Sequence, residues 1–208
     1  IPAAIQNLLN VTGMTVLNNF TSAFGADAVA AMGITQKINM VPMNISQGLS
    51  QGIMPLISYN YSSGNIPRMK KTLTFTMKIA LTFIVCMSAI YFFAANTVVN
   101  LFMENESIVA YGSRFLRGFC LGLPFLCLDF IAVGVFQAVG MGMKSLIFAI
   151  LRKIVLEIPA LFVLNRLFPL YGLAYAQFFA ELILAIIAII VLLRMFHNLD
   201  QQYQKQHT

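Results

Sequence analysis

Residues Ile79 to Met103, IALTFIVCMSAIYFFAANTVVNLFM, contain no charged residue. A bilayer core of about 30 Å requires roughly 20 residues of helix to cross it, and this stretch is long enough. Two further stretches, Ile1 to Ala26 and Ile38 to Pro67, are at least as long and equally free of charge. Each of the three predicts a transmembrane helix.

The composition of the whole chain supports the same interpretation. Hydrophobic residues make up 59% and charged residues 10% of the sequence, whereas soluble domains have about 45–50% and about 25%. Strands of a membrane barrel would run about 10 residues and alternate in polarity, which these segments do not. We therefore expect an all-α, polytopic membrane protein whose residues 1–196 form a six-transmembrane-helix bundle, followed by a polar cytoplasmic tail at 197–208. The expected helices are 1–24, 28–57, 72–101, 109–139, 145–167 and 171–195.

Several classes of protein are disfavoured by what the sequence contains. The net charge is +6, but the bases lie at the ends of apolar segments and form no single basic face, so we expect no nucleic-acid partner. The three cysteines lie in apolar segments without metal-ligand spacing, and no phosphate-binding loop or Ser-His-acid pattern is visible. We expect no catalytic residue, no metal site and no enzymatic activity. Because the chain lacks both an initiator Met and a signal peptide, we expect it to begin within a longer protein.

The distribution of Lys and Arg predicts the orientation in the membrane. Arg68, Lys70 and Lys71 lie in one loop, and Lys144 and Arg194 lie in others that should share its side. Cytoplasmic loops carry an excess of Lys and Arg, so this side is expected to be cytoplasmic, together with both termini.

Two helices carry polar stripes that a lipid-facing helix would lack. Spacings of three and four residues place the side chains of Asn7, Asn10, Met14 and Asn18 on one face of the first helix. The second helix repeats the pattern with Met40, Met43 and Gln47. Amides are costly in hydrocarbon, so these faces should meet other helices or water. Interhelical hydrogen bonds alone would explain one or two amides, and the full stripe favours a polar cavity that holds substrate.

Three acids lie well inside apolar segments: Asp129, Glu157 and Glu181. Ionisable residues in membrane helices are functional candidates, so all three are candidates for coupling an ion to transport. The alternative for Glu157 is an ion pair with Lys153, four residues earlier, and Arg152 could pair with either of the other two acids. Glu157 and Glu181 are expected at mid-bilayer depth, with Asp129 nearer the cytoplasmic side.

Several motifs resemble one family of membrane transporters. Residues 47–73, QGLSQGIMPLISYNYSSGNIPRMKKTL, resemble the eighth helix and the following loop of the MATE (multidrug and toxic compound extrusion) family. Residues 134–164, GVFQAVGMGMKSLIFAILRKIVLEIPALFVL, resemble its tenth and eleventh helices, and residues 169–186, PLYGLAYAQFFAELILAI, resemble the entry to its twelfth. The likeness spans nearly the whole chain and is greatest to the MepA-like bacterial branch.

The resemblance implies that this chain is the C-terminal six-helix lobe of a twelve-helix transporter in a bacterial inner membrane. Its partners would be membrane lipid, the missing N-terminal lobe and small lipophilic cationic substrates. A proton or sodium gradient would drive export by alternating access, with no other cofactor. In this branch the coupling acid is attributed to the N-terminal lobe, so Asp129 is a candidate from its burial and not from a motif.

Two alternatives stay open from the sequence. A lipid-linked flippase of the same superfamily would require a larger and more cationic cavity to bind pyrophosphate. A membrane scaffold subunit that transports nothing would use the amide stripes only to pack helices together.

Overall fold

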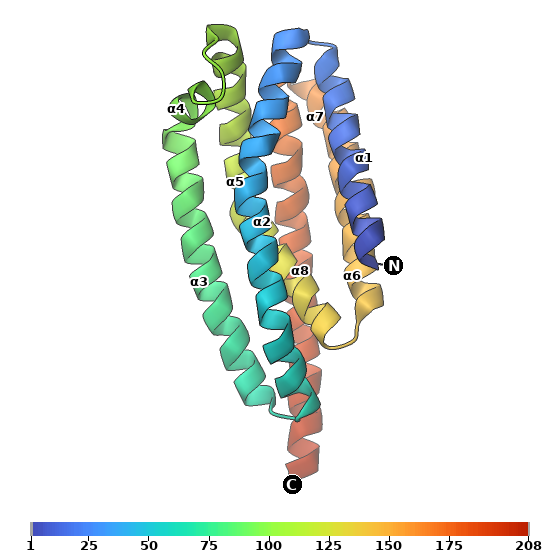
Figure 1. Ribbon diagram of the computed structural model, residues 1–208. Helices are drawn as coiled ribbons and strands as arrows, with labels where there is room; N and C mark the ends of the chain where they lie inside the picture. Colours follow the sequence, from blue (N-terminus) through green and yellow to red (C-terminus); the bar gives the residue numbers. More distant parts are fainter. Residues whose placement is uncertain (1, 208) are drawn as a thin grey trace.

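The computed structural model describes the backbone of residues 2–207 and the side chains of residues 5, 8–201 and 204, and within these the chain is helical without strands. The helices form one elongated bundle whose neighbours run mostly antiparallel (Figure 1). The elements are α1 (Pro2–Ser22), α2 (Ala26–Ser62), α3 (Ile66–Phe93), α4 (Ala95–Asn100), α5 (Glu106–Ala138), α6 (Gly142–Ile150), the π-helix η1 (Leu151–Glu157), α7 (Ile158–Leu167) and α8 (Gly172–His207). Because α6, η1 and α7 follow one another in a single column, the chain traverses the bundle six times, and the expected all-α bundle is confirmed.

The turns between helices form where the backbone can reverse. Gly64 and Gly140 have φ of 71° and 78°, a region that residues with a Cβ rarely enter, and each follows the end of a long helix. Asn65 then accepts a hydrogen bond from the backbone N–H of Arg68, which caps α3. Asn105 caps α5 in the same way by accepting from the N–H groups of Ser107 and Ile108.

Helix α5 lies at the centre of the bundle. In its most apolar window 72% of the residues are buried, compared with 17% in the corresponding window of α3. Buried Phe115, Phe119 and Phe136 of α5 pack against its neighbours, while α3 exposes Phe75, Phe83 and other large apolar side chains. The outer surface of α3 is thus suited to contact with lipid.

Three helices are long and apolar enough to cross a membrane by length and composition alone: α3, α5 and α8 as far as Gln201. The other three passages are more polar or are divided. Helices α1 and α2 carry the amide stripes, and the α6–η1–α7 column contains Arg152, Lys153 and Glu157. These polar passages are the ones that form the site described below.

The observed helix bounds differ from the expected ones in instructive places. Helix α3 begins at Ile66 and not at 72, because the Asn65 cap and Pro67 in the first turn start a helix that the following bases do not interrupt. The expected helix 72–101 is divided at Ala94 into α3 and α4, and the expected helix 145–167 contains the π-helix. The polar residues after Met195 continue α8 to His207 as helix.

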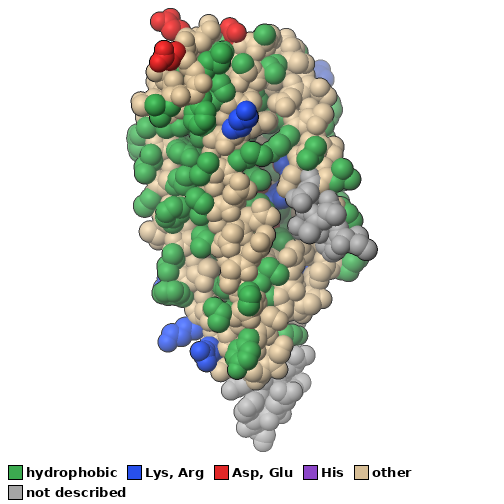
Figure 2. Space-filling view, viewed as in Figure 1, with side chains coloured by type: hydrophobic (Ala, Val, Ile, Leu, Met, Phe, Trp, Pro, Cys, Tyr) green, Lys and Arg blue, Asp and Glu red, His purple; other side chains and the backbone are tan. Residues whose placement is uncertain are grey.

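Charge is distributed unevenly along the bundle. In Figure 2 acidic side chains are visible only at the upper end, whereas Lys and Arg occur at several heights down to the lower end. The upper end contains Glu104 in the loop before α5 and Glu106 at the start of α5, and the lower end contains Arg68 and Lys71 near the start of α3.

Candidate functional site

The polar stripes of α1 and α2 face each other across a small cavity. Asn10 and Met14 of α1 line it together with Met40 and Met43 of α2, and its volume is about 50 Å³. Asn18 lies one turn above, where its side-chain oxygen accepts a hydrogen bond of 3.5 Å from Gln36. The side chain of Asn7, which belongs to the same stripe, lies outside the described residues.

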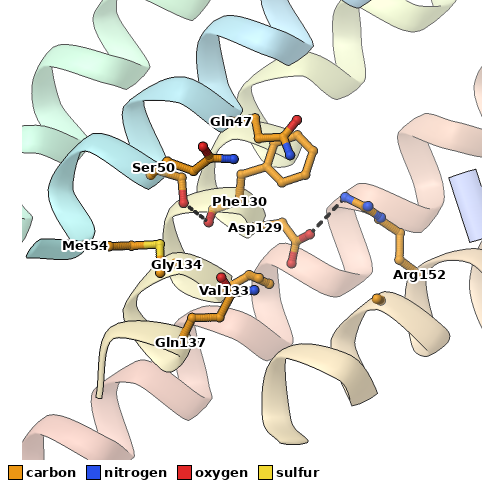
Figure 3. Close-up of a pocket in the computed structure, with 11 residues that line it drawn as sticks. Gln47, Ser50, Met54, Asp129, Phe130, Val133, Gly134, Gln137 and Arg152 are labelled. Atoms are coloured by element: carbon orange, nitrogen blue, oxygen red, sulfur yellow. Dashed lines mark hydrogen bonds and ion pairs between the residues drawn. The ribbon is translucent and has the colours of Figure 1, made fainter. Parts of the chain in front are cut away.

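A second cavity, of about 100 Å³, lies between α2, α5 and the start of η1. Figure 3 shows Gln47 and Ser50 of α2 beside Phe130 and Asp129 of α5, with Arg152 opposite. Ser50 donates a hydrogen bond of 2.6 Å to the Phe130 carbonyl, and an ideal Cβ placed on Gly134 would lie 2.2 Å from Ser50 Oγ. The glycine thus permits the close approach of α2 and α5 that shapes this cavity. Its lining residues are Gln47, Ser50, Gln51, Met54, Asp129, Phe130, Val133, Gly134, Gln137, Ala149 and Arg152.

Arg152 joins the two cavities. Its Nη1 donates to Asp129 Oδ2 at 3.3 Å and its Nη2 donates to Asn10 Oδ1 at 3.4 Å. The guanidinium also lies 5.0 Å from the centre of the Phe130 ring, within the range of a cation–π interaction. One buried cation therefore connects α1, α5 and η1.

A second ion pair lies one residue further along the π-helix. Lys153 Nζ is 2.6 Å from Glu157 Oε2 and 2.8 Å from Glu157 Oε1, and both side chains line the first cavity. Gly13 of α1 faces this pair, since an ideal Cβ there would lie 3.2 Å from Lys153 Nζ. The alternative interpretation of Glu157, as the partner of Lys153, is confirmed by this geometry.

Glu181 of α8 is the third acid of the cluster and is only 1% exposed. It interacts electrostatically with Arg152, as do Asp129 and Glu157, so acids expected at different depths in fact lie in one neighbourhood. Buried atoms without a hydrogen-bond partner include Glu181 Oε2, Asp129 Oδ1 and Arg152 Nε. With three acids and two bases, the fully ionised cluster would have one negative charge in excess.

The π-helix contains two adjacent bases, Arg152 and Lys153, whose side chains reach different acids. The N–H of Ile158 bonds to the carbonyl of Lys153, five residues earlier, which is the π pattern. Pro159 follows directly and has no N–H to donate to the turn before it, which weakens the ordinary α pattern there. In the resulting geometry Arg152 reaches Asp129 while Lys153 reaches Glu157.

The expectation that Arg152 pairs with Asp129 or Glu181 is confirmed for Asp129, but its bond to Asn10 was not foreseen. Sequence reasoning also missed Gln137, which lines the second cavity, and Gln177, which lines the first. Two consecutive bases inside an apolar segment were the available signal for Arg152, because such charges require buried partners. Among the described residues no group of three or more His, Cys, Asp and Glu is placed to hold a metal ion.

Comparison with known proteins places these features in a family. The family model MatE matches residues 2–163. The chain is 37% identical over 185 residues to the multidrug export protein MepA of Staphylococcus haemolyticus (strain JCSC1435), covering 88% of this chain and 40% of the relative. It is 36% identical over 193 residues to MepA of Staphylococcus aureus (strain MRSA252), covering 92% and 42%. A crystal structure of MATE in the bent conformation superposes with a TM-score of 0.91 at 20% identity, covering 98% of this chain and 45% of that one. The chain spans about two fifths of the length of these curated relatives.

Proposed function

The chain belongs to the MatE family, and from this premise we propose that it acts as the C-terminal lobe of a cation-coupled multidrug antiporter. Members of this family are membrane transporters and not enzymes. The proposed substrates are small lipophilic cations, the proposed coupling ion is a proton or Na⁺, and the proposed location is the bacterial inner membrane.

The observation that carries the proposal is that three buried acids share two bases. Lys153 is paired with Glu157 and Arg152 with Asp129. Among the described residues Glu181 is in no ion pair, although it interacts electrostatically with both bases. A buried carboxylate without a full counter-charge is costly, and binding a proton or a Na⁺ ion removes that cost. The cluster is therefore suited to take up and release one monovalent cation during each cycle.

The position of the cluster supports coupling to substrate. Arg152 bonds to Asn10, which lines the cavity between the amide and thioether stripes of α1 and α2. Flexible methionine side chains adapt to ligands of different shape, as a multidrug site requires. A cation bound at Asp129 would weaken its pair with Arg152 and so change the position of Asn10. A ligand moves only if its affinity differs between the two states of the transporter, and this linkage supplies such a difference.

The test uses vesicles that contain the full-length protein and a fluorescent lipophilic cation. We expect dye to be expelled when a proton or sodium gradient is imposed, with an opposite movement of that ion in step with the dye. Dye movement that is indifferent to both gradients would overturn the proposal.

Access of water to the first cavity would distinguish a transporter from a scaffold subunit. We expect cysteines placed at positions 10, 14 and 18 of the full-length protein to react with a water-soluble thiol reagent. The native cysteines would first be replaced, because Cys86 is exposed. Failure of all three positions to react, in protein that is folded by size exclusion, would favour a packing role for the amides.

A further inference from the structure

A third cavity, remote from the buried cluster, lies at the lower end of the bundle between α2, α6 and α8. It is a groove of about 620 Å³, lined by Tyr61, Met141, Lys144, Ile147, Phe148, Val191, Arg194, Met195, Asn198 and Leu199. We propose that this groove binds one anionic phospholipid, with the phosphate at Lys144 and Arg194 and an acyl chain along Ile147 and Val191. The proposal does not depend on the transport function.

The groove lies at the depth of a membrane interface. Lys144 is the third residue of α6, and Arg194 stands where the apolar part of α8 ends and the sequence turns to HNLDQQYQ. Tyr61 is at the end of α2, and tyrosine is enriched where hydrocarbon meets headgroups. The polar part of the groove is thus at headgroup level and the apolar part, with Ile147 50% exposed, points toward the hydrocarbon.

The two basic side chains of the groove, Lys144 and Arg194, favour the binding of an anion. Lys144 and Arg194 are both exposed and take no part in the three ion pairs of the described residues. No acidic side chain lines the groove within the same part of the chain. Helix α6 also begins here without a side-chain cap, so the positive end of its dipole adds to the two cations. Basic pockets between transmembrane helices on the cytoplasmic side suit anionic headgroups.

A neighbouring groove also contains a basic residue, but there the charge is paired within the chain. It lies between α3 and α8, has a volume of about 400 Å³ and contains Lys70. There Lys70 pairs with Asp200 and lies 5.6 Å from the centre of the Phe196 ring. Its charge is paired within the chain, whereas Lys144 and Arg194 are in no ion pair of the described residues and are accessible to an anion from outside. The same end of α8 therefore presents one satisfied and one unsatisfied basic groove.

The test measures lipid binding to the full-length protein by native mass spectrometry. Palmitoyl-oleoyl phosphatidylglycerol is compared with the phosphatidylcholine of the same chains, for the natural protein, Lys144→Gln, Arg194→Gln and the control Lys71→Gln. Lys71 is exposed at the same end but does not line the groove. We expect one phosphatidylglycerol to bind in preference, each groove variant to weaken it about fivefold and the double variant roughly 25-fold, from the strength of a basic residue near anionic lipid. The control should change it by less than about twofold.

Other outcomes would overturn the proposal. Equal binding of both lipids would mean that the groove has no headgroup preference, and an equal loss in Lys71→Gln would mean a diffuse effect of surface charge. If inorganic phosphate at millimolar concentration protects the protein against heat as well as phosphatidylglycerol does, the site takes a free anion and not a lipid. The variants Lys144→Arg and Arg194→Lys should retain binding, which separates loss of charge from loss of fold.

Discussion

At the residue scale, the three buried acids differ in what neutralises them. Glu157 has a base four residues away in the same π-helix, and Asp129 shares Arg152 with Asn10. Glu181 is in no ion pair among the described residues and interacts electrostatically with both Arg152 and Lys153. Removing the charge of each acid should therefore have a different consequence. The cluster cannot be treated as three equivalent carboxylates.

Glu181→Gln and Glu157→Gln should differ in their effects on efflux and on stability. Glu181→Gln removes the excess negative charge, so gradient-driven dye efflux should fall by about tenfold or more while stability is maintained or rises. Glu157→Gln leaves Lys153 without its partner and should lower the free energy of unfolding by about 2 kcal/mol. That is less than the 3–5 kcal/mol of a fully buried pair because the Lys153 side chain is 15% exposed.

Efflux in vesicles and the unfolding midpoint in detergent are the two measurements. If Glu181→Gln retains full coupled efflux, the acid has no part in coupling and Asp129 remains the candidate. Asp129→Asn, which replaces the ion pair with a hydrogen bond from the charged Arg152 guanidinium to a neutral amide oxygen, is the matched variant on α5.

At the element scale, the contact between α2 and α5 depends on a residue without a side chain. Gly134→Ala would place a methyl group 2.2 Å from Ser50 Oγ and 3.2 Å from the Ser50 carbonyl oxygen. Either the Ser50 hydroxyl would have to rotate and lose its bond to the Phe130 carbonyl, or the helices would have to separate. Either change should cost about 1–3 kcal/mol of stability and disturb the cavity that Asp129 lines. The matched control is Gly33→Ala on α2, where an added Cβ meets no atom within 4 Å.

Thermal unfolding of both glycine variants decides this prediction. Gly33→Ala should be neutral or stabilising by up to about 1 kcal/mol, because alanine favours helix more than glycine does. Equal stability of the two variants would show that α2 and α5 can separate at Gly134 without cost.

The faces of single helices could be predicted from the sequence, but the contacts between helices could not. Helical spacing places Asn10 and Met14 on one face of α1, since residues three and four apart share a face, and the structure has both lining one cavity with Met40 and Met43. The pairing of Arg152 with Asp129 depends on how separate helices pack, and no local pattern specifies that. The π-helix was missed because its only local sign is Pro159. Proline also occurs in the first turn of ordinary α-helices, so it does not identify a π-helix.

At the scale of the whole molecule, the uneven distribution of charge predicts the orientation. The end of the bundle with Arg68 and Lys71, near the start of α3, should be cytoplasmic and the end with Glu104 and Glu106 external. In a background without native cysteines, Ser63→Cys should be protected from an impermeant thiol reagent added to intact cells. A cysteine in place of Asn105 should react. Reaction at position 63 and protection at 105 would reverse the orientation.

Part of the exposed surface of α2 is unsuited to contact with lipid. Helix α2 exposes Asn44, Gln51 and the pair Gly48 and Gly52, and an added Cβ at either glycine meets no atom within 4 Å. Amides facing lipid are costly, and small residues four apart permit another helix to approach closely. The surface of α2 formed by these four residues is therefore the expected contact with the other lobe of the transporter.

Residues on that surface should cross-link to the other lobe. With the native cysteines replaced, Asn44→Cys should cross-link to cysteines on the N-terminal half in the full-length protein, whereas Phe83→Cys on the lipid-facing side of α3 should not. Expressed alone, the chain should aggregate in detergent, and co-expression with the other half should restore a single species by size exclusion. A lone chain that is monodisperse and as heat-stable as the full-length protein would mean that hydrocarbon tolerates these amides. The polar face of α2 would then need another explanation, such as contact with a second copy of the chain.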